Sequence, residues 1–184
     1  MQTKYETASL ILRICTKNDA MMVLDFYKRN YDDFAKYEPL TKSAMTQLRF
    51  HEDLLKYEYD TFLKGTTIRF YIFEKHNPLK IIGTVSYRNI AKSYYSSCQV
   101  GYKMDQSYRR KGYMRETLEL GNQLIFNELS LHRMEAIVMP DNAASIGLLE
   151  GLGFQREGLL HDKIFLNGRW EDHYLYALIN PKEA

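Results

Sequence analysis

Hydrophobic side chains recur at two periods along this chain, and the two periods predict alternating strands and helices. A period of two residues is typical of a strand with one buried face. It marks seven segments, which are Leu10–Cys15, Thr67–Lys75, Lys80–Asn89, Cys98–Met104, Arg133–Val138, Lys163–Leu166 and His173–Ile179. Because helical patterns separate half of the neighbouring strand segments, the order predicts a single α/β (α+β) domain over residues 1–184, with a mixed sheet and helices on both faces.

Steps of three and four residues between hydrophobic positions predict the helices. A first helix follows a cap at Thr16 or Asn18, and a second begins near Thr41 or Ser43 and ends at Gly65. A third helix follows the strand that ends at residue 104. Its buried face is predicted to contain Met114, Leu118, Gly121, Ile125 and Leu129.

Three further features lie between these patterns, namely an irregular segment, a capped short helix and a hairpin turn. Residues 32–41 contain Pro39, which disfavours helical geometry at the residue before it. Asp141 or Asn142 caps a short helix after the fifth strand. Asn167–Gly168 is a strong two-residue hairpin signal and joins the last two strands.

Residues 109–114 form a basic turn between a strand and a helix. Unpaired N–H groups and the positive end of the helix dipole meet there, which favours a phosphate or pyrophosphate. Gly112 permits close approach of a ligand, while Arg109, Arg110 and Lys111 add positive charge. The alternative is a solvated basic turn that caps an ordinary helix. The turn matches neither a Walker loop nor the three-glycine dinucleotide motif.

Composition excludes several other classes of protein. With 25 basic and 23 acidic residues the formal charge is +2, so no global field indicates nucleic-acid binding. Cys15 and Cys98 lack CxxC spacing and are predicted to be buried free thiols, and the five histidines show no metal-binding spacing, so no metal is expected. No signal peptide or apolar stretch of about 20 residues is present, which predicts a soluble, cytoplasmic protein without a membrane partner.

Several motifs along the chain resemble those of the GNAT superfamily of N-acetyltransferases. Residues 109–114 resemble its Q/R-x-x-G-x-G/A signature, with Met114 where the signature has Gly or Ala. Residues 142–158 resemble its second motif as written in the ribosomal-protein alanine N-acetyltransferase branch. The remaining matches are Leu12–Ile14 with Asn18–Ala20, Tyr37–Pro39, and Asn167–His173. The resemblance therefore extends over nearly the whole chain.

The resemblance implies a mostly antiparallel seven-stranded sheet whose central parallel pair, Cys98–Met104 and Arg133–Val138, splays apart around acetyl-CoA. The pantetheine arm would pair with the backbone of the first strand, and the pyrophosphate would lie on the amides of residues 109–114. Asn142 would hold the cosubstrate near its sulfur. The residues implied to bind acetyl-CoA are Tyr102, Lys103, Met104, Arg109, Arg110, Lys111, Gly112, Tyr113, Met114, Asn142 and Ser145.

The implied reaction is direct attack of an amine on the thioester. An N–H near residues 101–103 would stabilise the oxyanion, and Ser145 would protonate or hydrogen-bond the departing thiolate. From the residues alone, Asn142 and Ser145 are more readily explained as helix caps.

The general base is not assigned, because Ile164 stands where a related branch has glutamate. Glu38 is the first candidate and Asp172 the second. His161 and His173 are further possibilities, although a lone histidine in a strand is more often structural. Three aromatic residues are candidates for the walls of an acceptor slot, with core packing as the alternative: Tyr37, Tyr87 and Trp170.

The predicted function is acetyl transfer to a primary amine, most simply the N-terminal α-amine of a protein such as a ribosomal protein. An α-amine has a pKa of about 8, so its neutralisation at pH 7 costs only about 1 kcal/mol, against nearly 5 kcal/mol for lysine. One alternative is a small-amine acetyltransferase acting on a polyamine, an amino acid or an antibiotic. The other is a non-catalytic, regulatory CoA-binding module.

Overall fold

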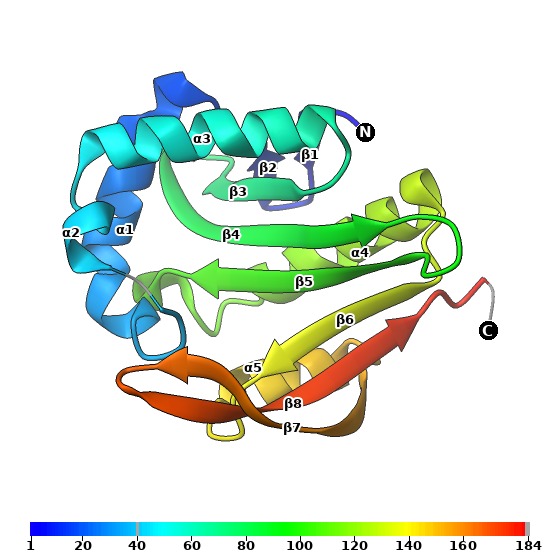
Figure 1. The fold of residues 1–184 in the computed structure, drawn as a ribbon. Coiled ribbons are helices and arrows are strands. Elements are labelled where there is room, and N and C mark those ends of the chain that lie inside the picture. The colour runs from blue at the N-terminus through cyan, green and yellow to red at the C-terminus, as the bar shows by residue number, and fades with distance from the viewer. Residues whose placement is uncertain (40, 183–184) are drawn as a thin grey trace.

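The computed structural model describes residues 1–39 and 41–182, which form one twisted sheet with helices on both faces (Figure 1). Within these residues the sheet has eight strands in the order β1-β2-β3-β4-β5-β6-β8-β7. The strands are β1 Lys4–Glu6, β2 Leu10–Arg13, β3 Ile68–Glu74, β4 Asn77–Ala91, β5 Ser97–Met104, β6 Arg133–Val138, β7 Gln155–Leu166 and β8 Arg169–Ile179. Each neighbouring pair is antiparallel except β5 and β6.

Five α-helices occur in the described part of the chain, together with short 3₁₀ turns at Lys17–Asp19 and Gln106–Tyr108. The helices are α1 Ala20–Phe34, α2 Lys42–Met45, α3 Leu48–Leu63, α4 Tyr113–Leu129 and α5 Ala143–Gly151. No helix among the described residues is long and apolar enough to cross a membrane.

The prediction of seven strands was wrong by one, because β1 was not recognised. This edge strand has three residues, too few for a period of two to appear. The side chain of Tyr5 anchors this strand to the rest of the protein. Its ring packs edge-on against Phe70 at 5.7 Å, and its hydroxyl donates to Glu128 at 2.8 Å. The strand predicted to begin at Lys80 also begins earlier, since β4 starts at Asn77.

The helical prediction for residues 41–65 was wrong in its continuity. The segment forms two helices, α2 and α3, with residues 46 and 47 between them. Leu55 is fully buried, whereas Leu48 is 37% exposed at the start of α3. The first helix also continues to Phe34, into the segment predicted to be irregular, because the Phe34 ring is buried against Phe26 and Tyr27.

Side chains alternate along the central strands and build a separate core on each face of the sheet. In β3, Phe70 and Ile72 join the core that contains α4, whereas Tyr71 and Phe73 join the core beneath α1 and α3. Both cysteines are buried and unpaired, as predicted. Burial raises the pKa of the Cys98 thiol to about 12, so that this thiol stays protonated.

The parallel pair separates part of the way along β5. Its register with β6 covers only Ser97–Gln99 opposite Arg133–Glu135. On its other side, β5 remains paired with β4 as far as Met104. The backbone after Gln99 therefore has one edge without a neighbouring strand, as the family resemblance implied. Figure 1 shows the gap that opens between β5 and β6, with α4 and α5 behind it.

Candidate active site

The turn at residues 109–114 has the backbone conformation that an anion site needs. Both Arg110 and Gly112 have positive φ, at 61° and 80°. Gly112 occupies the N-cap of α4, and the space where a Cβ would stand is open for 4 Å. Left-handed residues in a turn bring successive N–H groups toward one concave side. The turn therefore combines converging amides with the positive end of a 17-residue helix.

A cavity of about 700 Å³ extends from this turn to the open edge of β5, and we call it the larger cavity. Ten of the eleven residues predicted to bind acetyl-CoA line it: Tyr102, Lys103, Met104, Arg109, Arg110, Gly112, Tyr113, Met114, Asn142 and Ser145. Met114 is 9% exposed and belongs to the core against α4, as its place in the apolar stripe predicted. The larger side chain at this position is therefore accommodated inside the protein.

Two of the three basic side chains in the turn have partners within the protein. Lys111 is absent from the walls of the larger cavity, and its Nζ lies over the ring of Tyr108 at 4.9 Å. The Arg109 guanidinium forms an ion pair with Asp33, and its Nε donates to the carbonyl of Met104 at 3.3 Å. Arg109 thus joins α1 to the end of β5. Arg110 also lines the cavity, but it has no protein partner among the described residues.

A second cavity, of about 400 Å³, lies beside the first, and we call it the smaller cavity. It is bounded by the segment after α1, by β4, β5 and β6, by the start of α5 and by the hairpin β7–β8. The two cavities share five residues, which are Tyr37, Glu38, Tyr102, Asn142 and Ser145. A group bound in one cavity can therefore meet a group bound in the other at this junction.

Asn142 and Ser145 cap α5 and also line the junction. The Oδ1 atom of Asn142 accepts from the Ser145 N–H at 3.2 Å, which is the capping geometry weighed from the sequence. The Tyr102 hydroxyl reaches the carbonyl of Ser145 at 3.4 Å. Burial raises the pKa of Tyr102 to about 12, so its hydroxyl remains a proton donor at neutral pH. This hydroxyl was missed from the sequence, where only the backbone of Tyr102 was considered.

Glu38 reaches the junction from the segment after α1, and a lysine on β5 holds it there. Lys103 Nζ forms an ion pair with Glu38 Oε2 at 2.5 Å and lies 3.3 Å from the Tyr27 hydroxyl. The Lys103 side chain is 11% exposed and that of Glu38 36%. Glu38 is therefore positioned by a neighbouring cation, and Leu40, two residues further on, lies outside the described residues.

Asp172, the second predicted base, lies outside both cavities. Its carboxylate accepts from the Asp162 N–H at 2.9 Å and lies 3.1 Å from Nδ1 of His161. These contacts close an irregularity between β7 and β8, where the register shifts and Asp162 has a φ of 49°. The contacts of Asp172 thus lie within the β7–β8 hairpin and not at the junction of the cavities.

His173, the next residue on β8, does line the smaller cavity and is only 3% exposed. Its Nδ1 lies 3.0 Å from the carbonyl oxygen of Glu171. A carbonyl can only accept, so Nδ1 carries the proton and Nε2 is left with a lone pair. Nδ1 is therefore occupied as a donor to Glu171, and Nε2 is the ring nitrogen left for another partner in the smaller cavity.

The three aromatic residues considered for the acceptor slot lie in three different environments. Tyr37 lines both cavities. Tyr87 is fully buried, and its hydroxyl donates to Asn122 at 3.0 Å, so it belongs to the core. Trp170 is 58% exposed and packs edge-on against Phe165 at the tip of the hairpin, outside both cavities.

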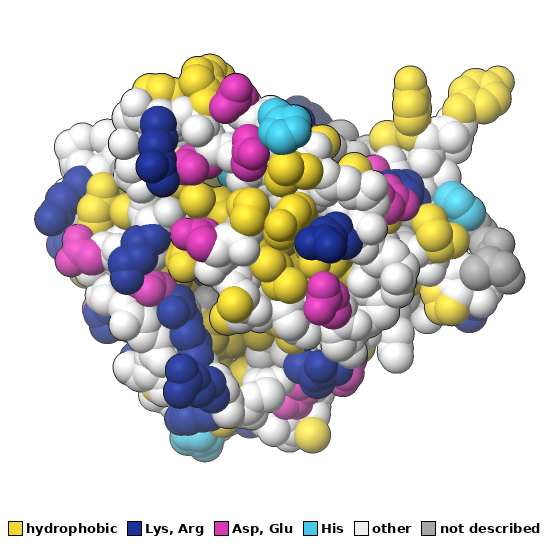
Figure 2. Space-filling view, turned by 90° about the horizontal axis from the view of Figure 1, so that it is seen from below, with side chains coloured by type: hydrophobic (Ala, Val, Ile, Leu, Met, Phe, Trp, Pro, Cys, Tyr) yellow, Lys and Arg dark blue, Asp and Glu magenta, His cyan; other side chains and the backbone are white. Residues whose placement is uncertain are grey.

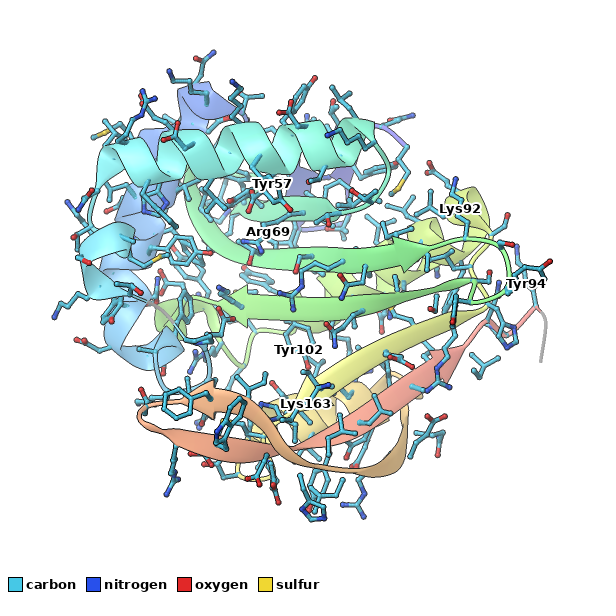
Figure 3. All side chains as sticks on the ribbon, viewed as in Figure 1. Tyr57, Arg69, Lys92, Tyr94, Tyr102 and Lys163 are labelled. Atoms are coloured by element: carbon cyan, nitrogen blue, oxygen red, sulfur yellow. The ribbon has the colours of Figure 1, made fainter. Side chains whose placement is uncertain are left out.

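The surface agrees with this arrangement. Figure 2 shows a hollow with hydrophobic walls and Lys and Arg side chains gathered along one side of it. In Figure 3, Tyr102 lies at the gap between β5 and β6.

A splayed parallel pair, a left-handed turn at a helix N-terminus and two cavities that join define an acyl transferase with a nucleotide-linked donor. Residues 9–155 match the acetyltransferase (GNAT) domain, and the chain belongs to this family of N-acetyltransferases.

The chain is similar to relatives over nearly its whole length. It is 30% identical to the probable N-acetyltransferase YjcK of Bacillus subtilis, covering 95% of this chain and 96% of that one. It is 28% identical to the [ribosomal protein uS5]-alanine N-acetyltransferase of Escherichia coli, covering 98% and 92%. The crystal structure of ribosomal-protein-S5-alanine acetyltransferase from Vibrio fischeri superposes with a TM-score of 0.92 at 30% identity, covering 98% of each chain.

Proposed function

We propose that this enzyme transfers the acetyl group of acetyl-CoA to the N-terminal α-amine of a protein, in the manner of the ribosomal-protein alanine acetyltransferases. The junction of the two cavities at Glu38, Tyr102 and Ser145 is the observation that carries the proposal. The similarity to the E. coli and V. fischeri enzymes supports a protein N-terminus as acceptor. A ribosomal protein is a cytoplasmic acceptor, so the proposal includes a cytoplasmic location.

The larger cavity fits acetyl-CoA by its own geometry. The left-handed turn at Arg110 and Gly112 offers amides to a pyrophosphate. Beyond Gln99, the open edge of β5 offers backbone groups to the amides of a pantetheine arm. When bound there, acetyl-CoA supplies an activated thioester to the junction.

Residues at the junction and in the smaller cavity bind the amine, accept its proton and stabilise the charges that form during transfer. Glu38 binds the incoming ammonium, and His173 takes the proton that the amine must lose before it attacks. Backbone N–H groups of β5 at residues 101–103 stabilise negative charge on the acetyl oxygen. The hydroxyls of Ser145 and Tyr102 donate to the departing thiolate, with Tyr102 kept protonated by its burial.

Two alternative functions have less support. A polyamine acceptor needs several free carboxylates, yet Glu38 is the single acidic residue that lines the smaller cavity within the described part of the chain, and it is paired with Lys103. A non-catalytic CoA-binding module needs no second cavity. The presence of His173 and Glu38 in the smaller cavity favours catalysis.

The test follows release of the CoA thiol with matched acceptors. Peptides that begin with a free alanine should be acetylated, whereas the same peptides with a blocked N-terminus should not react. Spermidine and free amino acids should be poor acceptors. Turnover of spermidine above that of every peptide would favour the small-amine function, and CoA binding without any turnover would favour the regulatory module.

A further inference from the structure

The smaller cavity contains an arginine without a partner. Two charged side chains line this cavity within the described residues, Glu38 and Arg88. Glu38 is already paired with Lys103. Arg88, on β4, is an exposed residue that lines the smaller cavity beside the junction, and it makes no hydrogen bond or ion pair with any described residue. The walls of the cavity therefore carry one positive charge that the protein does not balance.

A glycine makes room for this guanidinium beside the gap in the sheet. A Cβ placed on Gly101 would lie 3.3 Å from one Nη atom of Arg88, which is closer than an ordinary contact. Gly101 lies two positions beyond Gln99, which is the last residue of β5 that pairs with β6. The guanidinium therefore lies beside β5 where the gap begins. Arg88 is exposed, yet its guanidinium lies against this part of β5.

The nearby charged groups are occupied by other partners. Arg69, on β3, forms an ion pair with Glu58 of α3 at 3.1 Å, and Glu58 also accepts from the Tyr71 hydroxyl at 2.9 Å. Burial lowers the pKa of Arg88, the like charge of Arg69 lowers it further, and Glu38 acts in the opposite direction. The Arg88 guanidinium is thus near another cation and without a bound carboxylate.

We propose that Arg88 forms a subsite for a carboxylate of the acceptor, so that the enzyme prefers protein N-termini with an acidic side chain near the reacting amine. This inference rests on the proposed function and names the acceptor class. A guanidinium suits this role because its planar donors bind a carboxylate through two parallel hydrogen bonds. The same unbalanced charge repels the second ammonium of a polyamine, which separates the two acceptor classes.

The experiment uses the full-length enzyme, acetyl-CoA and short peptides that begin with alanine and carry Asp, Asn or Lys at position two, three or four. We expect the wild type to use the best Asp peptide about tenfold better in kcat/KM than its Asn counterpart, with the Lys peptide poorest. In Arg88→Gln the preference for Asp should disappear, while kcat/KM for the Asn peptide and the Kd for CoA stay within about twofold. Arg88→Lys should keep part of the preference, because it retains the charge but not the planar donors.

Lys92→Gln is the matched control, because Lys92 is an exposed cation in the connection after β4. Figure 3 places it at the far end of the sheet from Tyr102. Removal of this charge should leave the preference for Asp unchanged. Equal use of Asp and Asn peptides by the wild type would overturn the Arg88 inference and leave N-terminal acetylation standing. If no free N-terminus is acetylated, the proposed function fails and the inference with it.

Discussion

The two cavities that meet at the active site are built in opposite ways. The larger cavity is centred on one continuous stretch, in which β5, the turn at residues 109–114 and the N-terminus of α4 follow one another along the chain, and the end of α1 and the start of α5 complete its walls. The smaller cavity gathers Glu38, Arg88 and His173 from three distant segments. The larger cavity offers mainly backbone groups, whereas the smaller one offers side chains. Cosubstrate binding should therefore depend on backbone conformation, and acceptor use on individual side chains.

The two cavities also differ in how their charged side chains are paired. In the turn, Arg109 and Lys111 are held by Asp33 and by aromatic rings, and Arg110 remains for a ligand. In the smaller cavity, a chain of contacts from Lys103 to Glu38 fixes the acidic group, and Arg88 remains. Each cavity thus keeps one basic side chain without a protein partner among the described residues. Substitutions can test the two cavities separately.

The largest effect is expected at His173. His173→Gln removes the ring nitrogen proposed to take the proton of the amine, and we expect kcat to fall about 100-fold, the usual contribution of a positioned base. The Kd for CoA, measured by calorimetry, should not change, because His173 does not line the larger cavity. His161→Gln is the matched control, since His161 is an exposed histidine of the same hairpin. A kcat for His173→Gln within about threefold of wild type would remove His173 from the mechanism and return the role of base to Glu38.

A second prediction concerns the conformation of the turn. Gly112→Val forces a β-branched residue to adopt a φ of 80°, and relief of that strain should rearrange the turn. We expect the Kd for CoA to rise about 30-fold, which corresponds to about 2 kcal/mol. Gly112→Asn is the control, because asparagine tolerates the left-handed region and the space around Gly112 is open. If both variants bind CoA equally well, the turn does not hold the pyrophosphate through its backbone.

A third prediction separates two adjacent basic residues. Arg110 lines the larger cavity and Lys111 does not, although the sequence assigned both to the phosphate. Arg110→Glu should raise the KM for acetyl-CoA about tenfold, because it places a negative charge beside the pyrophosphate. Lys111→Glu should raise it less than about threefold, by long-range repulsion that added salt removes. Equal effects from the two reversals would mean that only the overall charge of the turn matters.

The contrast between the cavities also explains what the sequence could reveal. The turn, its glycine and the parallel strand pair lie close together along the chain, so hydrophobic periods and a short motif were enough to predict them. The assignment of Lys111 to the phosphate stays a prediction, because a motif shows which charges are present but not which lie over neighbouring rings, as Lys111 does over Tyr108. The strand β1 was missed because three residues carry no period and its pairing depends on a distant contact with Phe70.

The acceptor side was harder to predict because its residues come together only through the tertiary fold. Arg88 carried no signal in the sequence, since an arginine near the end of a strand is usually solvated. The pairing of Glu38 with Lys103 crosses 65 positions and depends on where α1 ends. The sequence favoured Asp172 over His173 as a base, but the alternation of β8 and the irregular hairpin turn only His173 toward the cavity.

The smallest effect is expected at Glu38, and its size tests how the acceptor is held. Glu38→Gln removes a carboxylate that is 36% exposed and already paired with Lys103, so solvent and the lysine both weaken its attraction for an ammonium. We expect the KM for an alanine peptide to rise about threefold, with the Kd for CoA unchanged. Lys103→Met should act in the opposite direction on acceptor binding, because it frees the carboxylate, provided that CoA binding confirms an intact β5. If Lys103→Met and Glu38→Gln weaken the acceptor equally and their effects do not add in the double variant, Glu38 serves only to anchor its own segment, and the ammonium is bound elsewhere in the smaller cavity.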